Sequence, residues 1–178
     1  MNDDIRVRRL GADEAAARAG ELADLLIDCV AGGASVSFMW PLSADKALAF
    51  WRRVADGVAS GERVLLVAED THGLAGTVQL VMGLPENQPH RGDVAKMLVH
   101  RRARRQGIAR RLMDAVDDAA RAERKTLLVL DTVTGGDAER LYARAGWQRV
   151  GEIPHYALYP DGRPCSTTVF FKAIPSLD

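Results

Sequence analysis

The chain has 178 residues, of which 47% are hydrophobic and 27% charged, and its 24 basic and 24 acidic side chains give a formal net charge of zero. This length and composition predict a single domain, residues 1–178, with a buried core. The balanced charge argues against a dedicated nucleic-acid-binding protein, which usually carries a basic surplus. No apolar run reaches the roughly 18 residues of a membrane helix, so no membrane partner is expected.

Cysteine, histidine and the N-terminal segment limit the class of protein further. The two cysteines, Cys29 and Cys165, lie far apart and predict neither a disulfide framework nor a zinc site. The four histidines lack the spacing of metal ligands, so no metal is expected. The first ten residues, MNDDIRVRRL, lack the apolar segment of a signal peptide, and we expect a cytoplasmic protein.

The first third of the chain predicts one strand and two helices. Alternating apolar residues predict a strand over Ile5–Leu10. Apolar residues at helical spacing predict helices over Glu14–Val30 and Ala44–Ala59, the second of them capped by Ser43. The segment Ala31–Ser43 contains glycine, serine and proline and predicts a loop, although it is rich in apolar residues. Such a loop either packs beneath a helix or lines a substrate pocket.

The remaining chain alternates strands with helices. Strands are predicted over Arg63–Glu69, Leu74–Met82, Asp93–His100 and Thr126–Val133, and near Gln148–Ile153 and Thr167–Lys172. Helices are predicted over Gln106–Glu123 and between Asp137 and Gly146. This order predicts an α/β fold with one mixed, mostly antiparallel sheet of about seven strands and helices on both of its faces.

The segment His100–Arg111, with the sequence HRRARRQGIARR, joins a predicted strand to a predicted helix and contains six arginines. A helix N-terminus presents free N–H groups and a partial positive charge, which together bind anions. Gly107 and Ala109 are small enough to let an anion approach the main chain, and Arg104 and Arg105 add charge. The pattern Arg-x-x-Gly-x-Ala therefore predicts a site for a small polyanion.

This segment resembles the acetyl-CoA pyrophosphate loop of the GNAT N-acetyltransferases, whose pattern is Gln/Arg-x-x-Gly-x-Gly/Ala. The segment LYARAGWQRVGEI resembles the Tyr-x-x-x-Gly-Phe/Trp ending of the same family. Within the family, GGASVSFM, LLVLDT, RVGEIPHY and FFK are most similar to tabtoxin-resistance acetyltransferases, over about Gly32–Lys172. The resemblance implies an acetyl-CoA-dependent N-acetyltransferase in which the amine of an amino-acid-like or antibiotic- or toxin-like small molecule attacks acetyl-CoA directly. It is also compatible with a homodimer.

The resemblance also implies roles for particular residues. The coenzyme A diphosphate would be bound by the loop residues Arg104, Arg105, Gln106, Gly107, Ile108 and Ala109. The main-chain N–H groups of Leu98 and Val99 would donate to the thioester oxygen. Tyr142 would give a proton to the departing thiolate, unless it only packs beside its neighbours.

Asp93 and Asp131 form a candidate acidic pair, because each lies at an end of a predicted strand. One would orient the substrate amine and the other would assist its deprotonation; the alternative is that each is simply solvated at a strand end. Two departures from the family bear on this site. Asp93 is shorter than the glutamate that the resemblance leads us to expect, and Gly135 stands where many members have an asparagine that contacts coenzyme A.

Three other functions remain open from the sequence. The acceptor is a protein N-terminus or lysine in the first of them, and this needs an open groove. In the second, the chain is a non-catalytic acyl-CoA-binding module, which would bind coenzyme A without turning over any amine. In the third, the arginines bind nucleic acid, and binding would then depend steeply on salt.

Overall fold

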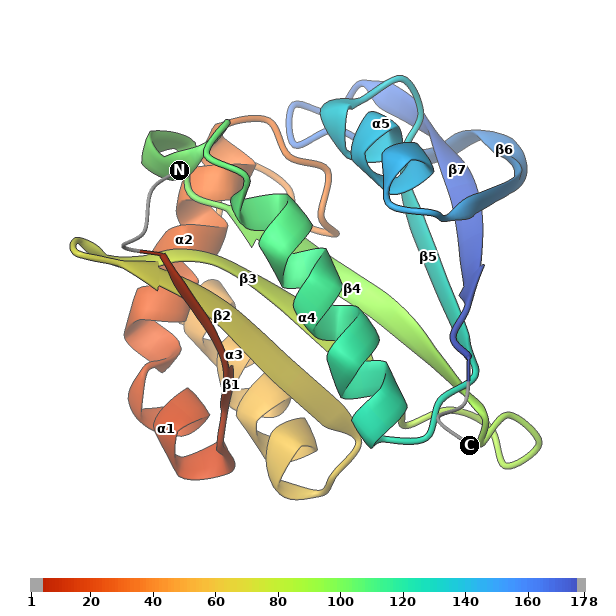
Figure 1. Cartoon of the computed structure of the whole chain (residues 1–178). Helices are drawn as coiled ribbons and strands as arrows, with labels where there is room; N and C mark the ends of the chain where they lie inside the picture. Colours follow the sequence, from red (N-terminus) through yellow and green to blue (C-terminus); the bar gives the residue numbers. More distant parts are fainter. Residues whose placement is uncertain (1–4, 176–178) are drawn as a thin grey trace.

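The computed structural model describes residues 5–175 and contains one seven-stranded sheet in the order β1-β2-β3-β4-β5-β7-β6 (Figure 1). Only the β4–β5 pair is parallel, so the sheet is mostly antiparallel, as predicted. The strands are β1 (Arg6–Leu10), β2 (Arg63–Asp70), β3 (Gly73–Val81), β4 (Arg91–Val99), β5 (Leu127–Val133), β6 (Gln148–Leu158) and β7 (Pro164–Ala173).

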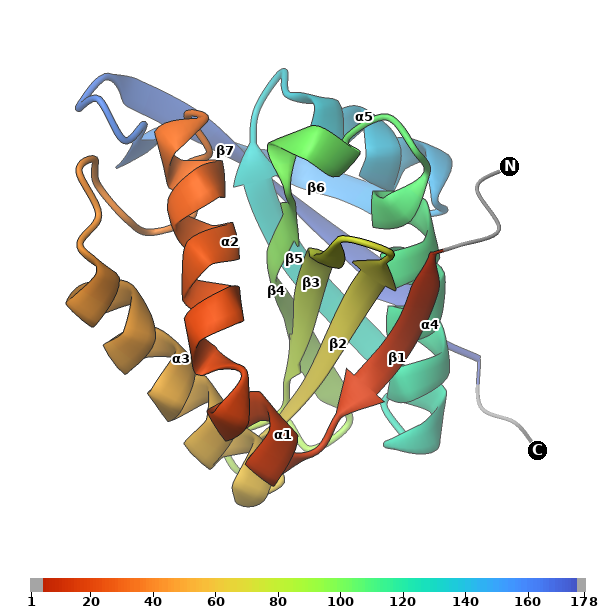
Figure 2. The same ribbon diagram turned by 90° about the vertical axis from the view of Figure 1, so that its left-hand side faces the viewer.

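Helices cover the two faces of the sheet unequally (Figure 2). They are α1 (Ala12–Ala17), α2 (Ala19–Ala31), α3 (Ala44–Ala59), α4 (Ile108–Ala122) and α5 (Asp137–Arg144), with a 3-10 turn over Arg101–Ala103. Helices α1, α2 and α3 lie on one face, while α4 and α5 lie on the other (Figures 1 and 2). Within residues 5–175, no helix is both long and apolar enough to cross a membrane.

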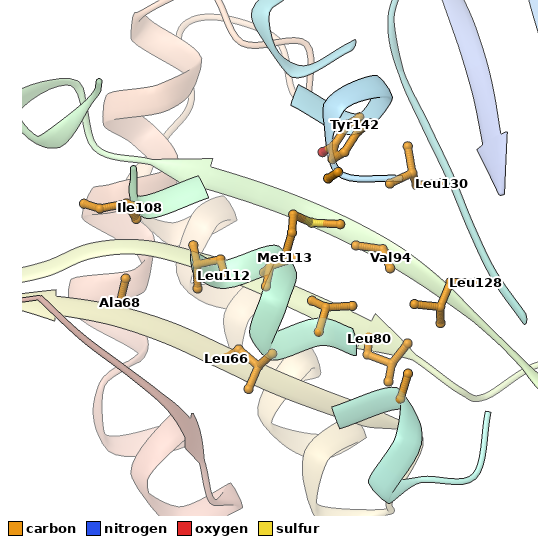
Figure 3. Packing of buried hydrophobic residues seen from close by; sticks show 14 of the residues in the cluster. Leu66, Ala68, Leu80, Val94, Ile108, Leu112, Met113, Leu128, Leu130 and Tyr142 are labelled. Carbon is orange, nitrogen blue, oxygen red and sulfur yellow. The ribbon is translucent and has the colours of Figure 1, made fainter. Parts of the chain in front are cut away.

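Two hydrophobic clusters hold these layers together. One lies beneath α2 and α3 and includes Leu22, Leu26 and Trp51, all fully buried. The other lies between α4 and the sheet, where Ile108 and Leu112 point toward the strands (Figure 3). The helical spacing of these apolar residues explains why each helix buries one stripe against the sheet. Helices therefore pack against both faces of the sheet.

Two predicted elements differ from the structure. The helix predicted over Glu14–Val30 is two helices, α1 and α2, because the backbone of Arg18 leaves helical geometry (φ −99°, ψ 13°). The β6–β7 hairpin is longer than predicted. Nearly every residue of the edge strand β6 is exposed, so its sequence shows no apolar alternation from which its full length could be predicted. The pairing of β6 with β7 is also irregular between Ile153 and Ala157.

Glu69 at the end of β2 links the first strand to the first helices. Its carboxylate lies 2.6 Å from Arg8 Nε and 2.5 Å from Arg18 Nη1, and all three side chains are largely shielded from water. The hydrogen bond from Arg8, together with Arg18, holds the pKa of Glu69 below its usual value. A depressed carboxyl pKa stabilises the fold above the unfolded pKa, and this contribution is lost as pH falls through the folded pKa.

We therefore expect Glu69→Gln to lower the free energy of unfolding by about 1–2 kcal/mol at neutral pH. The difference from the wild type should shrink as pH falls below about 4.3, the ordinary glutamate pKa. Urea titrations between neutral and acidic pH measure both effects. Glu86→Gln, in the exposed loop before β4, is the control and should change neither. An unchanged difference at every pH would show that Glu69 acts by packing and not by charge.

Candidate active site

Strands β4 and β5 are paired over only three residues each. Arg91, Gly92 and Asp93 align with Leu127, Leu128 and Val129, and beyond this point the two strands have no ladder contacts. Figure 1 shows β5 turning away from β4 toward the end of the sheet where α5 lies. Main-chain groups on the facing edges of both strands are thus left without ladder partners, as a bound extended ligand would require.

A β-bulge in β4 accompanies this divergence. Between its pairings with Thr77 and Gln79 of β3, β4 advances three residues, from Leu98 to Ala95, while β3 advances two. Lys96 lies within this bulge and has a left-handed backbone conformation with φ 53°. Because a bulge bends its strand and increases the local twist, it directs β4 away from β5.

The N-terminus of α4 lies just beyond the end of β4. Gly107 is the N-cap residue with φ 79°, no side chain caps the helix, and its first turn contains no acidic residue. A Cβ at Gly107 would meet no atom within 4 Å, so the main chain at this residue is open to a ligand. The residues present therefore fit a diphosphate, which such N–H groups and the helix dipole attract.

The six arginines of this segment differ in their partners. Three of them form ion pairs with nearby aspartates: Arg101 with Asp28, Arg102 with Asp70 and Arg110 with Asp114. Arg104 has no carboxylate partner among residues 5–175; its Nε lies 3.5 Å from the carbonyl of Val99, and its guanidinium also interacts with Cys29. Arg105 and Arg111 pair with no carboxylate in the part of the chain that the structure describes. Half of the arginine charge in this segment is thus compensated by aspartates, and the uncompensated charge lies close to the N-terminus of α4. This distribution disfavours a broad basic surface for nucleic acid.

Tyr142 of α5 projects from the other side toward the diverging strands. Its ring lies 6.0 Å from the ring of Trp147 and 6.1 Å from that of Phe170, and the residue is only 4% exposed. Figure 3 shows it above Leu130 and facing Met113. Its hydroxyl forms no hydrogen bond within residues 5–175. Burial, with the nearby charge of Asp131, raises the pKa of Tyr142 to about 12, so the phenol stays protonated at neutral pH.

The two aspartates share the sheet face opposite α4. Their neighbours Val94 and Leu130 lie in the cluster beneath α4, and successive side chains alternate between faces. Contrary to the sequence prediction, neither aspartate ends a strand: Asp93 is the third residue of β4 and Asp131 is the fifth of β5. Asp131 nevertheless lies beside the gap, because the pairing of β4 with β5 stops before it.

Asp93 and Asp131 differ in the side chains that contact their carboxylates. Asp93 accepts a short hydrogen bond from Nη1 of Arg91, so its charge is already balanced. Asp131 has no ion-pair partner among residues 5–175, and its Oδ2 lies 2.9 Å from the hydroxyl of Thr167. Because a hydroxyl on one oxygen fixes the carboxylate and leaves its other oxygen free, Asp131 is better placed than Asp93 to receive a proton.

The two candidate main-chain donors, the N–H groups of Leu98 and Val99, point in opposite directions. His100 N donates to the carbonyl of Ala75 on β3, at 2.9 Å. Main-chain groups alternate in direction along a strand, so the N–H of Leu98 also faces β3 and that of Val99 faces the opposite side. Of the two expected donors, Val99 is therefore the one directed toward the gap.

The sequence analysis missed Lys96 and Thr167. Lys96 is the only charged residue in the run Val94–Val99, and a charge inside an apolar strand was the available signal. Its Nζ lies 3.1 Å from Ser37 Oγ in the α2–α3 loop and 5.8 Å from the ring centroid of Phe50. Burial lowers the pKa of the Lys96 ammonium, and attraction by Asp131 opposes part of that shift. Thr167 gave no signal because its contact with Asp131 spans two strands.

A bulged strand, a diverging parallel neighbour and an uncapped helix N-terminus thus lie together at one end of the sheet, where an extended anionic ligand would fit. A family model described as "Acetyltransferase (GNAT) domain" matches residues 61–149, half of the chain. The chain therefore belongs to the GNAT acetyltransferases. The matched segment includes β4, the anion site at α4 and Tyr142.

Solved structures agree with this assignment at the level of the fold. A putative acetyltransferase from Salmonella typhimurium, whose structure includes its cofactor acetyl-CoA, has a TM-score of 0.76 at 17% identity, covering 97% of this chain and 95% of its own. A ribosomal-protein-alanine N-acetyltransferase from Brucella melitensis has a TM-score of 0.77 at 19% identity, covering 94% and 99%. A putative phosphinothricin N-acetyltransferase has a TM-score of 0.76 at 15% identity, covering 97% and 99%.

Family membership makes the chain an acetyl-CoA-dependent acyltransferase, with acetyl-CoA as its cosubstrate. The acceptor does not follow from the family. The similar structures include one named for a ribosomal protein and one named for a small molecule, at identities that show the fold alone.

Proposed function

We propose that the whole chain acts as one N-acetyltransferase domain that moves an acetyl group from acetyl-CoA to the amine of a small molecule by direct attack. The observation that carries the small-molecule proposal is the α2–α3 loop. Ser35 Oγ donates to the carbonyl of Leu158 at 2.8 Å, and Trp40 N donates to that of Pro160 at 3.1 Å. Ser37 also contacts Lys96 on the β4 bulge. The loop thus bridges from β4 to the β6–β7 hairpin, and this bridge supports an acceptor that is small enough to bind beneath it.

A protein acceptor would need an open groove at the place where this loop lies. The loop is also held from beneath, because Val36 and Phe38 pack against the α2–α3 cluster. The expectation that this segment packs against helices is confirmed. That it also lines a substrate pocket stays a prediction. Within the small-molecule acetyltransferases, a specific kinship with tabtoxin-resistance enzymes stays a prediction.

Acetyl-CoA supplies the acetyl group as a thioester when it is bound, and the α4 N-terminus with Gly107 would hold its diphosphate. The chain's own groups would then handle the protons. Asp131, positioned by Thr167, holds the substrate ammonium and takes one of its protons, so that a neutral amine attacks the thioester carbon. The second proton leaves the nitrogen for water after the nitrogen–carbon bond has formed. The N–H of Val99 stabilises the negative charge that develops on the thioester oxygen. Tyr142 donates its hydroxyl proton to the sulfur as the carbon–sulfur bond breaks.

Release of the coenzyme A thiol during incubation with acetyl-CoA tests this function. The assay should compare a panel of free amino acids, amino sugars and polyamines with a panel of peptides. Turnover of one class of small amines and not of peptides supports the proposal. Turnover of peptides alone would replace it with the protein-acceptor function. Saturable binding of acetyl-CoA without turnover of any amine or peptide would favour the non-catalytic module.

We expect Asp131→Asn to lower kcat/KM by roughly 100-fold or more with the best acceptor, because a positioned base contributes about 10²–10⁴-fold. Asp93→Asn should change kcat/KM by less than about tenfold, since that carboxylate is already paired with Arg91. The affinity for acetyl-CoA should be unchanged in both variants. The reverse ranking would assign the base to Asp93 and show that Arg91 releases it in the working enzyme.

A further inference from the structure

We propose that Lys96 binds an acidic group of the acceptor, so that the substrate is a small amine that also carries a carboxylate, as a free amino acid does. This inference rests on the proposed function and specifies the chemical class of its acceptor. It makes Lys96 a specificity-determining residue that holds the far end of the substrate while the amine reacts at Asp131.

The surroundings of Lys96 are incomplete for a positive charge. The ammonium has one hydroxyl, Ser37 Oγ at 3.1 Å, and one aromatic ring, Phe50 at 5.8 Å, as its polar neighbours. Among residues 5–175, no carboxylate oxygen lies within 4.0 Å of it. A partly buried ammonium is destabilised unless it is paired and hydrogen-bonded. An anionic ligand would provide the missing partner.

Nearby charges leave this ammonium without internal compensation. Asp93 lies on the same strand but is paired with Arg91. Arg63, which donates to Gln79 Oε1, is positive and repels Lys96. Asp131 attracts Lys96 but lies beyond ion-pair distance. The sheet face opposite α4, where we place the acceptor, therefore carries a negative charge at Asp131 and a separate positive charge at Lys96.

This separation fits a zwitterionic acceptor. Asp131 attracts the substrate ammonium before it loses its proton, and Lys96 attracts the carboxylate of the same molecule. The bulge explains why the lysine can do this. It adds one residue to β4, and the left-handed backbone of Lys96 sends the side chain toward Ser37 and Phe50 on the α2–α3 side. A polyamine or an aminoglycoside lacks an anionic group and would be repelled at this position.

Kinetic comparison of matched acceptors tests the inference. The probes are the standard L-amino acids and the carboxamide of each, which removes the negative charge and keeps the amine. We expect the wild type to prefer the best free acid over its amide by about 10- to 100-fold in kcat/KM, the range that a charged hydrogen bond supplies. Lys96→Met should abolish this preference mainly by raising KM for the acid, and Lys96→Arg should restore it.

Two controls separate binding from other roles. Ser37→Ala removes the hydrogen bond to the loop and should leave the preference for the acid intact. Rescue by arginine, which does not deprotonate, excludes a role for Lys96 as a general base. Acetyl-CoA affinity, measured by calorimetry, should be the same in every variant.

The outcomes distinguish this inference from the function on which it rests. Turnover of amides and acids at equal rates, or a preference that survives Lys96→Met, would overturn the role of Lys96 and leave the small-amine acetyltransferase standing. Failure of every small amine, with or without a carboxylate, would overturn the proposed function and this inference together. A preference that Lys96→Arg restores would establish the acidic acceptor.

Discussion

Gly107→Ala is expected to weaken acetyl-CoA binding by roughly 100-fold and to lower the free energy of unfolding by about 1–2 kcal/mol. The added methyl group would keep a diphosphate from approaching the main chain at the start of α4, and two lost charge-assisted hydrogen bonds account for about 3 kcal/mol. The left-handed backbone at Gly107, with φ 79°, adds about 1–2 kcal/mol of strain when a Cβ is present. Calorimetric titration with acetyl-CoA measures the affinity, and urea titration measures the stability.

Gly61→Ala provides a matched control. Gly61 has φ 76°, lies in the turn between α3 and β2, and also has no atom within 4 Å of an added Cβ. The two variants should therefore lose similar stability, while only Gly107→Ala loses affinity. Equal affinities for acetyl-CoA in both variants would show that the diphosphate does not lie over the N-terminus of α4.

Local features of the sequence explain why the helix start at Gly107, on which the proposed anion site rests, was predictable. The proposed anion site depends on one glycine, one helix start and the charges next to them, all within the segment Arg104–Ala109. The same holds for α3, whose predicted bounds and Ser43 cap agree with the structure, where Ser43 Oγ accepts from Lys46 N at 3.3 Å. Short-range patterns report such features because the partners lie within one helical turn.

The acceptor side could not be predicted equally well, because its contacts join distant parts of the chain. The bulge at Lys96 depends on the register of β3 against β4, which no periodicity in β4 reveals. Nothing in the sequence distinguishes Asp93 from Asp131. In the structure, Asp93 forms an ion pair with Arg91, whereas Asp131 accepts a hydrogen bond from the neutral hydroxyl of Thr167. The length of β6 was missed for a different reason, since an exposed edge strand needs no apolar pattern.

Tyr142→Phe is expected to lower kcat by roughly 100-fold and to leave the affinity for acetyl-CoA and the stability unchanged. The hydroxyl has no hydrogen-bond partner within residues 5–175, so its removal leaves no protein group unsatisfied, and the ring keeps its contacts with Trp147 and Phe170. The expected effect is at the lower end of the 10²–10⁴ range for general acids, because a phenol with a pKa near 12 holds its proton tightly.

The raised pKa has two opposite consequences for this residue. It keeps the phenol protonated throughout the neutral range, so a proton is always available. It also makes transfer of that proton to the thiolate energetically uphill, because an ordinary thiol has a pKa of about 8.5. The hydroxyl therefore first stabilises the charge that develops on the sulfur by a hydrogen bond, and its proton passes to the sulfur as the phenolate is reprotonated from water. Tyr156→Phe, on the exposed part of β6, is the control and should keep full activity. If Tyr142→Phe also keeps its full kcat in single-turnover measurements, the tyrosine only packs beside its neighbours, and water protonates the thiolate.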